Sequence, residues 1–515
     1  MKTPQEMWIL IKNKIKKQWK TAFLAAFVLG LCIHMPVMVS DIPNHDGLDS
    51  IYFDQNMITS GRWFLSVACG FSSYYSLPWV IGLLGMVFLG ITAALLTEYL
   101  ELENTLTVVM VSGLLVAFPA LASTFAYVFT LDGYMLGLLL AVSACLCVKK
   151  HKYGFVTGGI CLAFSMGTYQ AYLPVAMLLC VYALIDIFME EGSVPSKIKA
   201  GLHYLYMGII GVGLYYGILQ VLLKIQGKEL ADYQGISGMT AGAGKGLGST
   251  LIEMYRNFGA FTLKGNVFWN NLFSGAALCL LVIAVLVVLT GLIKERKWWK
   301  SPLFFVIIAL MVLLVPLVCN VILVISPDVN YHLMMRYQWV LLLILPIAFV
   351  DKYAPRTASG VGAGWCILFA AAVLLLNYAV TDNIAYSNLQ KKYEKTYAYC
   401  LRILDRIEST PGYYPGIPVA LMGMVSDEQY PITDVTEDVT SGMIGMGGDT
   451  LLYTGANYHA FIKHYLGATL NLLPTSDMAE IYFTEEYTNM ESFPGAEGVK
   501  LVDGIIYVKT ENFNR

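Results

Sequence analysis

Charged side chains are scarce in this chain. Lys, Arg, Asp and Glu make up 13% of its 515 residues, whereas soluble domains carry about 25%. Hydrophobic residues make up 57%. The formal net charge is only −3, which gives no indication of a nucleic-acid partner. The composition instead predicts an α-helical polytopic membrane protein that has membrane lipids as its neighbours.

The sequence also lacks the common metal and nucleotide motifs. It has no Cys-x-x-Cys and no His-Glu-x-x-His pattern, and most of its ten cysteines fall inside apolar runs. They are interpreted as small buried hydrophobic residues, so no metal site is predicted. The glycine-rich stretch 235–250 is not a P-loop, because Lys245 is followed by Gly246 and not by Ser or Thr. We interpret it as a flexible or re-entrant segment that leads into an amphipathic helix, Thr250 to Phe258.

Apolar segments recur along the first three quarters of the chain. A membrane helix needs about 20 apolar residues, and about eleven segments meet or approach this length. The predicted spans are 21–39, 78–97, 105–123, 127–148, 154–170, 171–189, 201–223, 271–293, 301–325, 337–350 and 361–380. The first follows a lysine-rich start and is interpreted as an uncleaved helix with a cytoplasmic N-terminus.

The distribution of Lys and Arg predicts the orientation. Lysine clusters such as 149–152 and 294–300 fall in loops assigned to the inside, while the outer loops carry few cations. Eleven spans then place the first loop, 40–77, the long loop 224–270 and the C-terminal part of the chain outside. The predicted domains are a membrane domain, 1–380, and an extracytoplasmic domain, 381–515.

The C-terminal domain is predicted to be a small α/β unit. Residues 388–409 repeat apolar side chains at helical spacing, and 418–422 form a short apolar strand pattern. A second helix is predicted over 458–466, before Gly467. Strand patterns at 499–502 and 505–508 flank Asp503-Gly504, which predicts a hairpin.

The first outer loop is unusually acidic for so apolar a chain. It holds Asp41, Asp46, Asp49 and Asp54, and ionisable residues beside hydrocarbon are functional candidates. A carboxylate can accept a proton from a hydroxyl nucleophile, and cations can stabilise a leaving phosphate. The same predicted face gathers further candidates at the ends of spans: Arg62, Trp63, Asp132, Tyr169, Gln170, Lys264, His332 and Arg336.

Each candidate also has a structural interpretation. Asp46 precedes Gly47 and can belong to a turn, and Asp132 can cap the helix that follows it. Arg336 lies beside Tyr337 and can anchor a span at the interface, where His332 also fits.

Four short motifs give the chain a family resemblance. The chain resembles the glucosyltransferase II family at these motifs: Asn44-His45-Asp46-Gly47, Ser60-Gly61-Arg62-Trp63, Gly167-Thr168-Tyr169-Gln170 and the strand Pro418–Met422 after an amphipathic helix. These are bacterial and phage membrane enzymes that decorate surface polysaccharide. The resemblance covers most of the chain, but not residues 424–515.

The resemblance implies a GT-C-like fold in the bacterial cell membrane and an active site at the outer face. It also implies a polyprenyl-phosphate sugar donor and a catalytic acid in the first outer loop. Asp46 matches that position best. The family often has two adjacent acids there, whereas this chain has His45-Asp46, so Asp41 or Asp49 remains open as the partner acid.

The expected reaction is an inverting transfer of a hexose, with glucose favoured, to a surface polysaccharide or glycan. Asp46 would deprotonate the acceptor hydroxyl, and Arg62, Arg336 or Lys264 would stabilise the leaving phosphate. No cofactor is required, although a divalent cation is compatible. Two alternatives are a transporter or flippase of lipid-linked sugars and a polysaccharide polymerase. Transporters tend to show internal repeats and charges at the membrane midplane, which are not evident here.

Overall fold

The chain divides into two compact units. The computed structural model describes residues 2–49, 57–69, 77–190, 192–231, 246–298, 302–326, 329–423, 452 and 454–510. Unit 1 comprises Met1–Val39 and Asp54–Asn383, and unit 2 comprises Ser40–Phe53 and Ile384–Arg515. Residues 40–53, which the sequence placed in the membrane domain, therefore group with the C-terminal part of the chain.

In the described part of unit 1, all the secondary-structure elements are helices. Its elements are α1 (Pro4–Lys14), α2 (Lys17–Met38), α4 (Leu65–Ala68), α5 (Pro78–Leu100), α6 (Thr105–Ala117), α7 (Pro119–Phe125), η1 (Val128–Thr130), α8 (Leu131–Lys150), α9 (Gly154–Thr168), η2 (Gln170–Tyr172), α10 (Leu173–Met189), α11 (Val194–Gln226), α13 (Leu247–Lys264), α14 (Leu272–Glu295), α15 (Pro302–Cys319), α16 (Ile322–Ile325), η4 (Leu333–Val340), α17 (Leu341–Tyr353) and the first part of α18 (Ala358–Glu408).

Among the described residues, eight helices are long and apolar enough to cross a membrane. They include α2, α5, α11, α14 and α18, together with α8, α10 and α17 extended by the short helices that precede them. α6 and α7 would form a ninth span, bent by 46° where Pro119 begins α7. α9 and Phe305–Cys319 are shorter apolar helices. All lie on predicted spans, while the total of eleven and the orientation stay predictions.

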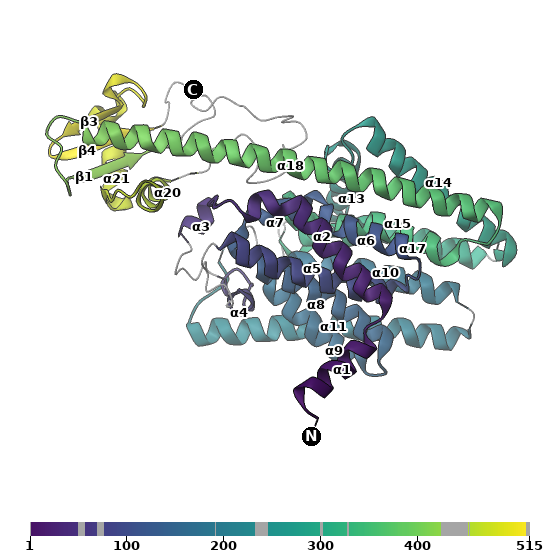
Figure 1. The fold of residues 1–515 in the computed structure, drawn as a ribbon. Coiled ribbons are helices and arrows are strands. Elements are labelled where there is room, and N and C mark those ends of the chain that lie inside the picture. Colours follow the sequence, from purple (N-terminus) through teal and green to yellow (C-terminus); the bar gives the residue numbers. More distant parts are fainter. Residues whose placement is uncertain are drawn as a thin grey trace. The chain divides into compact units, whose positions relative to one another are not determined.

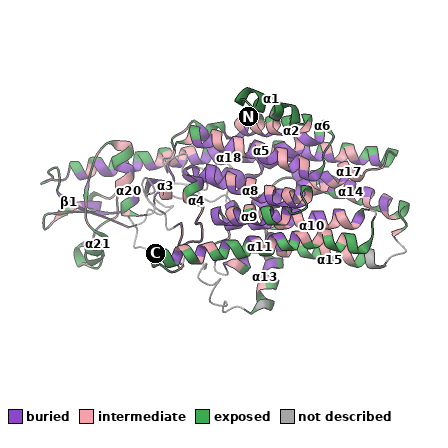
Figure 2. Ribbon diagram, turned by 90° about the horizontal axis from the view of Figure 1, so that it is seen from below, coloured by how far each residue is buried: buried purple, intermediate pink, exposed green. Residues whose placement is uncertain are grey.

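A chain of packed helices forms the body of unit 1. α2 packs on α5 and α6, α5 on α8, α8 on α9, and α9 on α11 (Figure 1). Among the described spans, η4 with α17 and η1 with α8 have the largest buried shares, whereas α11 is mostly exposed (Figure 2). Glycines permit the close α2–α5 contact, since a Cβ at Gly90 would lie 2.7 Å from the Phe23 ring.

Paired charges fix the ends of several helices. Glu98 at the end of α5 contacts Lys16 at 2.7 Å and Lys150 of α8 at 2.6 Å. Lys352 of α17 lies 2.7 Å from Asp186 of α10. Charges beside hydrocarbon are tolerated when they are paired, so these contacts set how the helix ends assemble.

Unit 2 combines helices with a small sheet. α18 continues into it without a break over 51 residues. The other elements are α3 (His45–Asp49), β1 (Pro418–Met422), α20 (Gly455–Phe461), η5 (Ile462–Leu466), β2 (Asn471–Leu472), α21 (Thr475–Tyr482), α22 (Glu485–Thr488), η6 (Ala496–Gly498), β3 (Val499–Val502) and β4 (Ile505–Lys509).

The sheet has the strand order β2-β1-β4-β3. β1 runs parallel to β2 and β4, and β3 and β4 form an antiparallel hairpin. The hairpin turns at Asp503 and Gly504, whose φ angles are 49° and 80°. The strand over 418–422 and the Asp-Gly hairpin are therefore confirmed.

The core of unit 2 includes a residue from the first loop. Leu48 of α3 is 6% exposed and packs in one cluster with Ile407 of α18, Leu421 of β1, Phe461 of α20 and Val508 of β4. Asn457 of α20 also donates a hydrogen bond to the carbonyl of His45 at 3.5 Å. The acidic loop is thus built onto the α/β unit.

Candidate functional site

Unit 1 contains a polar pocket that gathers four of the candidate residues. Its volume is about 70 Å³, and its lining includes Arg62, Tyr169, Gln170 and His332. They come from the turn after Met57, from η2 and from the segment before η4. The apolar part of the wall is formed by Ala171, Ile322, Val329, Met334 and Met335.

Arg62 is presented by a tight turn. Gly61 has a φ of 76°, a conformation that glycine adopts without strain, and the Arg62 amide donates to the Met57 carbonyl at 2.6 Å. The Arg62 guanidinium donates to Ser60 Oγ at 2.9 Å and to the Tyr134 hydroxyl at 3.2 Å. These bonds aim a delocalised cation along the pocket wall, where it can bind an oxyanion.

Gln170 holds this turn from the other side. Its Nε2 donates to the Ser60 carbonyl at 3.0 Å and to the Tyr215 hydroxyl at 3.1 Å. Tyr215 of α11 donates in turn to the Gly61 carbonyl at 3.2 Å. Gln170 therefore positions the backbone that carries Arg62.

Aromatic residues form another part of the wall. Tyr169 stacks on Tyr134, with ring centroids 4.6 Å apart and an interplanar angle of 21°. Both side chains line the pocket. Because Tyr134 also accepts the hydrogen bond from Arg62, the stack helps to fix the guanidinium.

Trp63 is next to Arg62 but lies outside the lining of this pocket. It packs edge-on against Phe164 of α9, with centroids 5.3 Å apart. A Cβ at Gly167 would come within 2.6 Å of the indole, and the Phe64 amide donates to the Gly167 carbonyl at 2.7 Å. In this structure Trp63 anchors the turn on α9.

Asp132 lies in the first turn of α8 and is fully buried. Its Oδ1 accepts a hydrogen bond from the Gly133 amide at 2.9 Å. Burial, together with the neighbouring charge of Asp132, raises the pKa of Cys69 well above its ordinary value. Asp132 is therefore packed against the short helix α4, outside the pocket lining.

His332 brings an uncharged imidazole to the pocket. Burial and the nearby charge of Arg336 lower the pKa of His332 to about 4, so the ring is neutral at physiological pH. Its Nδ1 is buried and makes no hydrogen bond within the described part of the chain. A neutral imidazole can donate or accept one hydrogen bond toward a bound molecule.

Arg336 links η4 to α13. Its guanidinium lies 3.7 Å from the Tyr331 ring centroid and 4.7 Å from that of Phe261. Nη1 donates to Asn257 Oδ1 at 2.7 Å, and Nε and Nη2 donate to the Tyr331 carbonyl at 3.3 and 2.9 Å. Lys264, the remaining cation candidate, ends α13 and is exposed. Neither residue lines the pocket.

The three candidate acids belong to unit 2. Asp46 lies in the first turn of the short helix α3, where its amide donates to Asn44 Oδ1 at 2.9 Å. Its side chain is 47% exposed and lies 3.3 Å from His45 Nε2. Partial burial raises the pKa of Asp41, and a hydrogen bond from the Tyr465 hydroxyl offsets part of that rise.

Asp49 ends α3, but its side chain lies outside the described residues, as do Asp54 and most of the glycine-rich stretch. Within the part of the chain that the structure describes, no group of three or more His, Cys, Asp and Glu side chains is arranged to hold a metal ion.

Three residues that hold Arg62 or its turn by hydrogen bonds, Ser60, Tyr134 and Tyr215, were absent from the sequence-based candidates. Ser60 and Tyr134 lie within two residues of candidates, and proximity could have indicated them. Tyr215 lies inside an apolar span, where nothing in the sequence marks it.

Comparison with known proteins assigns the chain to a family. The family described as "Glucosyl transferase GtrII" matches residues 35–347, which is more than half of the chain. The match includes the acidic loop and all the cation candidates and ends before the α/β sheet. No curated protein and no solved structure matches the chain. The chain therefore belongs to the glucosyl transferase GtrII family, as its short motifs predicted.

Proposed function

We propose that this membrane protein transfers a hexose, with glucose favoured, from a polyprenyl-phosphate donor to a polysaccharide or glycan at the outer face of the bacterial cell membrane. The family supports glucosyl transfer, and the long apolar helices support a multi-pass protein. The lipid donor, the glycan acceptor, the GT-C-like arrangement of eleven spans and the outward-facing C-terminal unit are parts of the proposal.

The observation that carries the proposal is the arrangement of Arg62, Gln170 and His332 around one pocket. The pocket volume of about 70 Å³ exceeds the roughly 10–15 Å³ that one water molecule requires in the same measure, so the pocket can accept a small polar group such as a phosphate. Arg62 would bind the phosphate oxygens in two places, and His332 would hydrogen-bond to a further oxygen or to the sugar.

The base in this proposal is Asp46. The acceptor oxygen forms a bond to the anomeric carbon from the face opposite the phosphate, which inverts the configuration. The bond from the anomeric carbon to the phosphate oxygen breaks, and the phosphate leaves with the electron pair. The acceptor proton passes to the Asp46 carboxylate, whose exposed side chain is accessible to a hydroxyl group. Asp41 and Asp49 remain candidates for the partner acid.

Arg62 is the preferred phosphate-binding cation because it lines the pocket. Arg336 commits three of its N–H groups to Tyr331 and Asn257, so its proposed role is to position the segment that carries His332. Arginine can neutralise a leaving monophosphate without a metal. A divalent cation is compatible with the reaction but is not required.

A reconstituted transfer assay tests the proposal. Purified full-length protein is incubated with polyprenyl-phosphate glucose, bearing labelled glucose, and a surface glycan. The expected result is label on the glycan and release of polyprenyl phosphate. The matched control replaces the donor by a nucleotide-linked glucose. Movement of the lipid-linked sugar across the bilayer without transfer would support a flippase, and joining of preformed repeat units would support a polymerase.

A further inference from the structure

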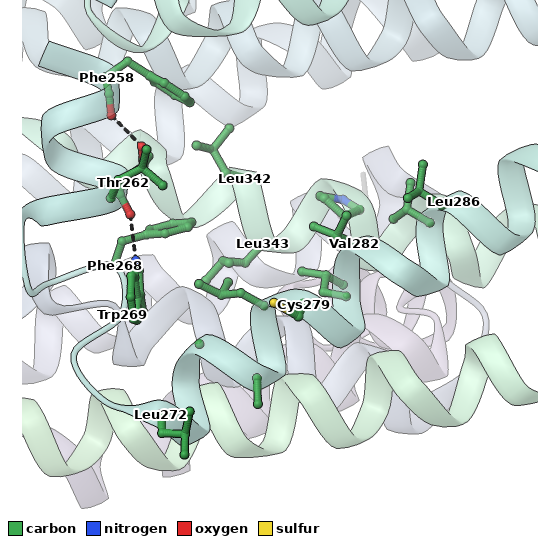
Figure 3. A pocket seen from close by; sticks show the side chains of 17 residues that line it. Phe258, Thr262, Phe268, Trp269, Leu272, Cys279, Val282, Leu286, Leu342 and Leu343 are labelled. Carbon is green, nitrogen blue, oxygen red and sulfur yellow. Dashed lines mark hydrogen bonds between the residues drawn. The ribbon is translucent and has the colours of Figure 1, made fainter. Parts of the chain in front are cut away.

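Many exposed apolar side chains of unit 1 lie along its spans, where the bilayer covers them. The apolar groove formed by α13, α14 and α17 (Figure 3) is of this kind, since α14 is long enough to cross a membrane. α1 is different. It has only 11 residues, too few to cross a bilayer, yet Met7, Trp8 and Leu10 are exposed on it. A spanning arrangement therefore does not explain these side chains.

α1 is a capped helix that stands apart from the protein around it. The Glu6 amide donates to the Thr3 hydroxyl at 3.2 Å, and the Thr3 amide donates to Glu6 Oε2 at 2.8 Å, which together form a capping box. Every side chain of α1 that the structure describes is exposed. Isolated helices shorter than about 12–15 residues are marginal in water. A surface outside the described chain is therefore needed to keep α1 folded.

The apolar residues of α1 form one complete turn. Met7, Trp8, Ile9 and Leu10 follow one another, and Trp8 is 59% exposed. Met7 and Leu10 are three residues apart, so they share one face of the helix. An exposed apolar turn of this kind gains free energy when it leaves water. It is suited to the boundary between lipid headgroups and acyl chains, where tryptophan is enriched.

α1 is held close to the start of the first span. α2 begins at Lys17, and only Ile15 and Lys16 separate the two helices. Both have extended backbones, with ψ angles of 115° and 153°, and two extended residues reach about 7 Å. Lys16 also contacts Glu98 of α5 at 2.7 Å, which fixes this joint at one end of the helix bundle. α1 turns away from the line of α2 at the joint (Figure 1), so it can lie along the membrane surface.

The charge of this segment selects the kind of surface. Residues 1–20 contain six lysines and a single acid, Glu6, whose carboxylate is engaged in the capping box. Lys16 is paired with Glu98. The other lysines of the segment are exposed: Lys2, Lys12, Lys14, Lys17 and Lys20. A surface rich in negative charge complements them, whereas a second copy of the same helix would repel them.

We propose that α1 binds a bilayer surface rich in anionic phospholipid. The lysines contact the lipid phosphates, and the apolar turn of residues 7–10 reaches the start of the acyl chains. Helices that bind in this way sink about 5–10 Å into the boundary between headgroups and acyl chains. The proposal is independent of glucosyl transfer, because it uses no residue of the polar pocket or of the acidic loop.

Hydrogen–deuterium exchange tests this interaction in the full-length protein. The protein is placed in nanodiscs of phosphatidylcholine alone or of phosphatidylcholine mixed with phosphatidylglycerol, and exchange over residues 4–14 is followed by mass spectrometry. We expect slower exchange of α1 in the mixed nanodiscs. Salt at about 1 M should weaken the effect, since the Debye length falls to about 3 Å. Exchange of α2 should be the same in both nanodiscs and serves as the internal reference.

Matched substitutions separate the lysines of α1 from charge elsewhere. Lys12→Gln combined with Lys14→Gln should lower the protection of α1 in the mixed nanodiscs about thirtyfold, since each lysine near an anionic surface contributes about fivefold to binding. Lys224→Gln combined with Lys228→Gln removes the same charge from exposed positions at the end of α11. This control should change the protection less than about twofold.

Three results would overturn the proposal. The first is equal exchange of α1 in the two kinds of nanodisc, or full protection in the Lys12 and Lys14 double variant. The second is unchanged protection in Trp8→Ser, which would leave the apolar turn without a part in binding. The third is equal protection in detergent micelles that hold no phospholipid, which would assign the cover of α1 to protein.

Discussion

Replacement of Arg62 by Met is the sharpest test of the polar pocket. The substitution keeps a long side chain but removes the charge and the bonds to Ser60 and Tyr134. Each bond contributes about 1 kcal/mol to folding, so unfolding should become easier by about 2 kcal/mol. The loss of a cation that stabilises the leaving phosphate should lower kcat by about 10²–10³-fold. The two effects are measured separately, by thermal unfolding and by release of polyprenyl phosphate.

Two further variants distinguish the charge of Arg62 from the contacts that hold its side chain in place. Ser60→Ala removes one anchor of the guanidinium but leaves its charge, so kcat should fall less than about tenfold. Lys264→Met removes an exposed cation outside the pocket lining, and kcat should stay within about twofold of the wild type. An Arg62→Met enzyme that folds and releases phosphate at near-normal rates would refute the assignment of Arg62 to the phosphate.

Four further outcomes are expected. Asp46→Asn should fold normally, because the side chain is half exposed, and should lower the transfer rate by about 10²–10⁴-fold; normal transfer would shift the role of base to another acid of the loop. Arg336→Met should lower the Tm, since it removes three hydrogen bonds, while the affinity for the donor changes little. An unchanged Tm would contradict the structural role of Arg336. The raised pKa of Asp41 means that the folded state prefers the neutral carboxyl group. The free energy of unfolding therefore falls as the pH rises from about 4. Asp41→Asn should raise the Tm at pH 7 and leave it unchanged near pH 3. In intact cells, cysteine at Lys150 should be shielded from an impermeant thiol reagent and cysteine at Asp503 should react, and the reverse pattern would invert the proposed orientation.

The positions of the membrane helices could be predicted from the sequence because span length is a property of composition. Every predicted span overlaps an apolar helix. The continuity of α18 was not predicted. Its apolar part ends near residue 380, which indicated a boundary, but the polar residues that follow include neither Pro nor Gly before Pro411. The helix therefore continues while its environment changes.

The site could be predicted in part. Arg62, Gln170 and His332 were candidates because polar residues at span ends are unusual, and the structure brings them to one pocket. Their supporting contacts could not be predicted, since the bond from Tyr215 to Gly61 joins segments about 150 residues apart. For the same reason, the packing of the acidic loop in the C-terminal core could not be predicted from the sequence. The contacts of Trp63 with Phe164 of α9 were likewise not predicted, and the proposed roles of Trp63 and Asp132 stay predictions.

The place of Leu48 in the core of unit 2 determines when the first loop can fold during biosynthesis. Its partners on α20 and β4 leave the ribosome about 400 residues later, which takes about 20–80 s at 5–20 residues per second. Throughout that interval the acidic loop has been made but its hydrophobic partners have not. The loop can take its final form only after the last helices and strands arrive. A chain cut before α20 would therefore keep its membrane helices and still lack a folded first loop.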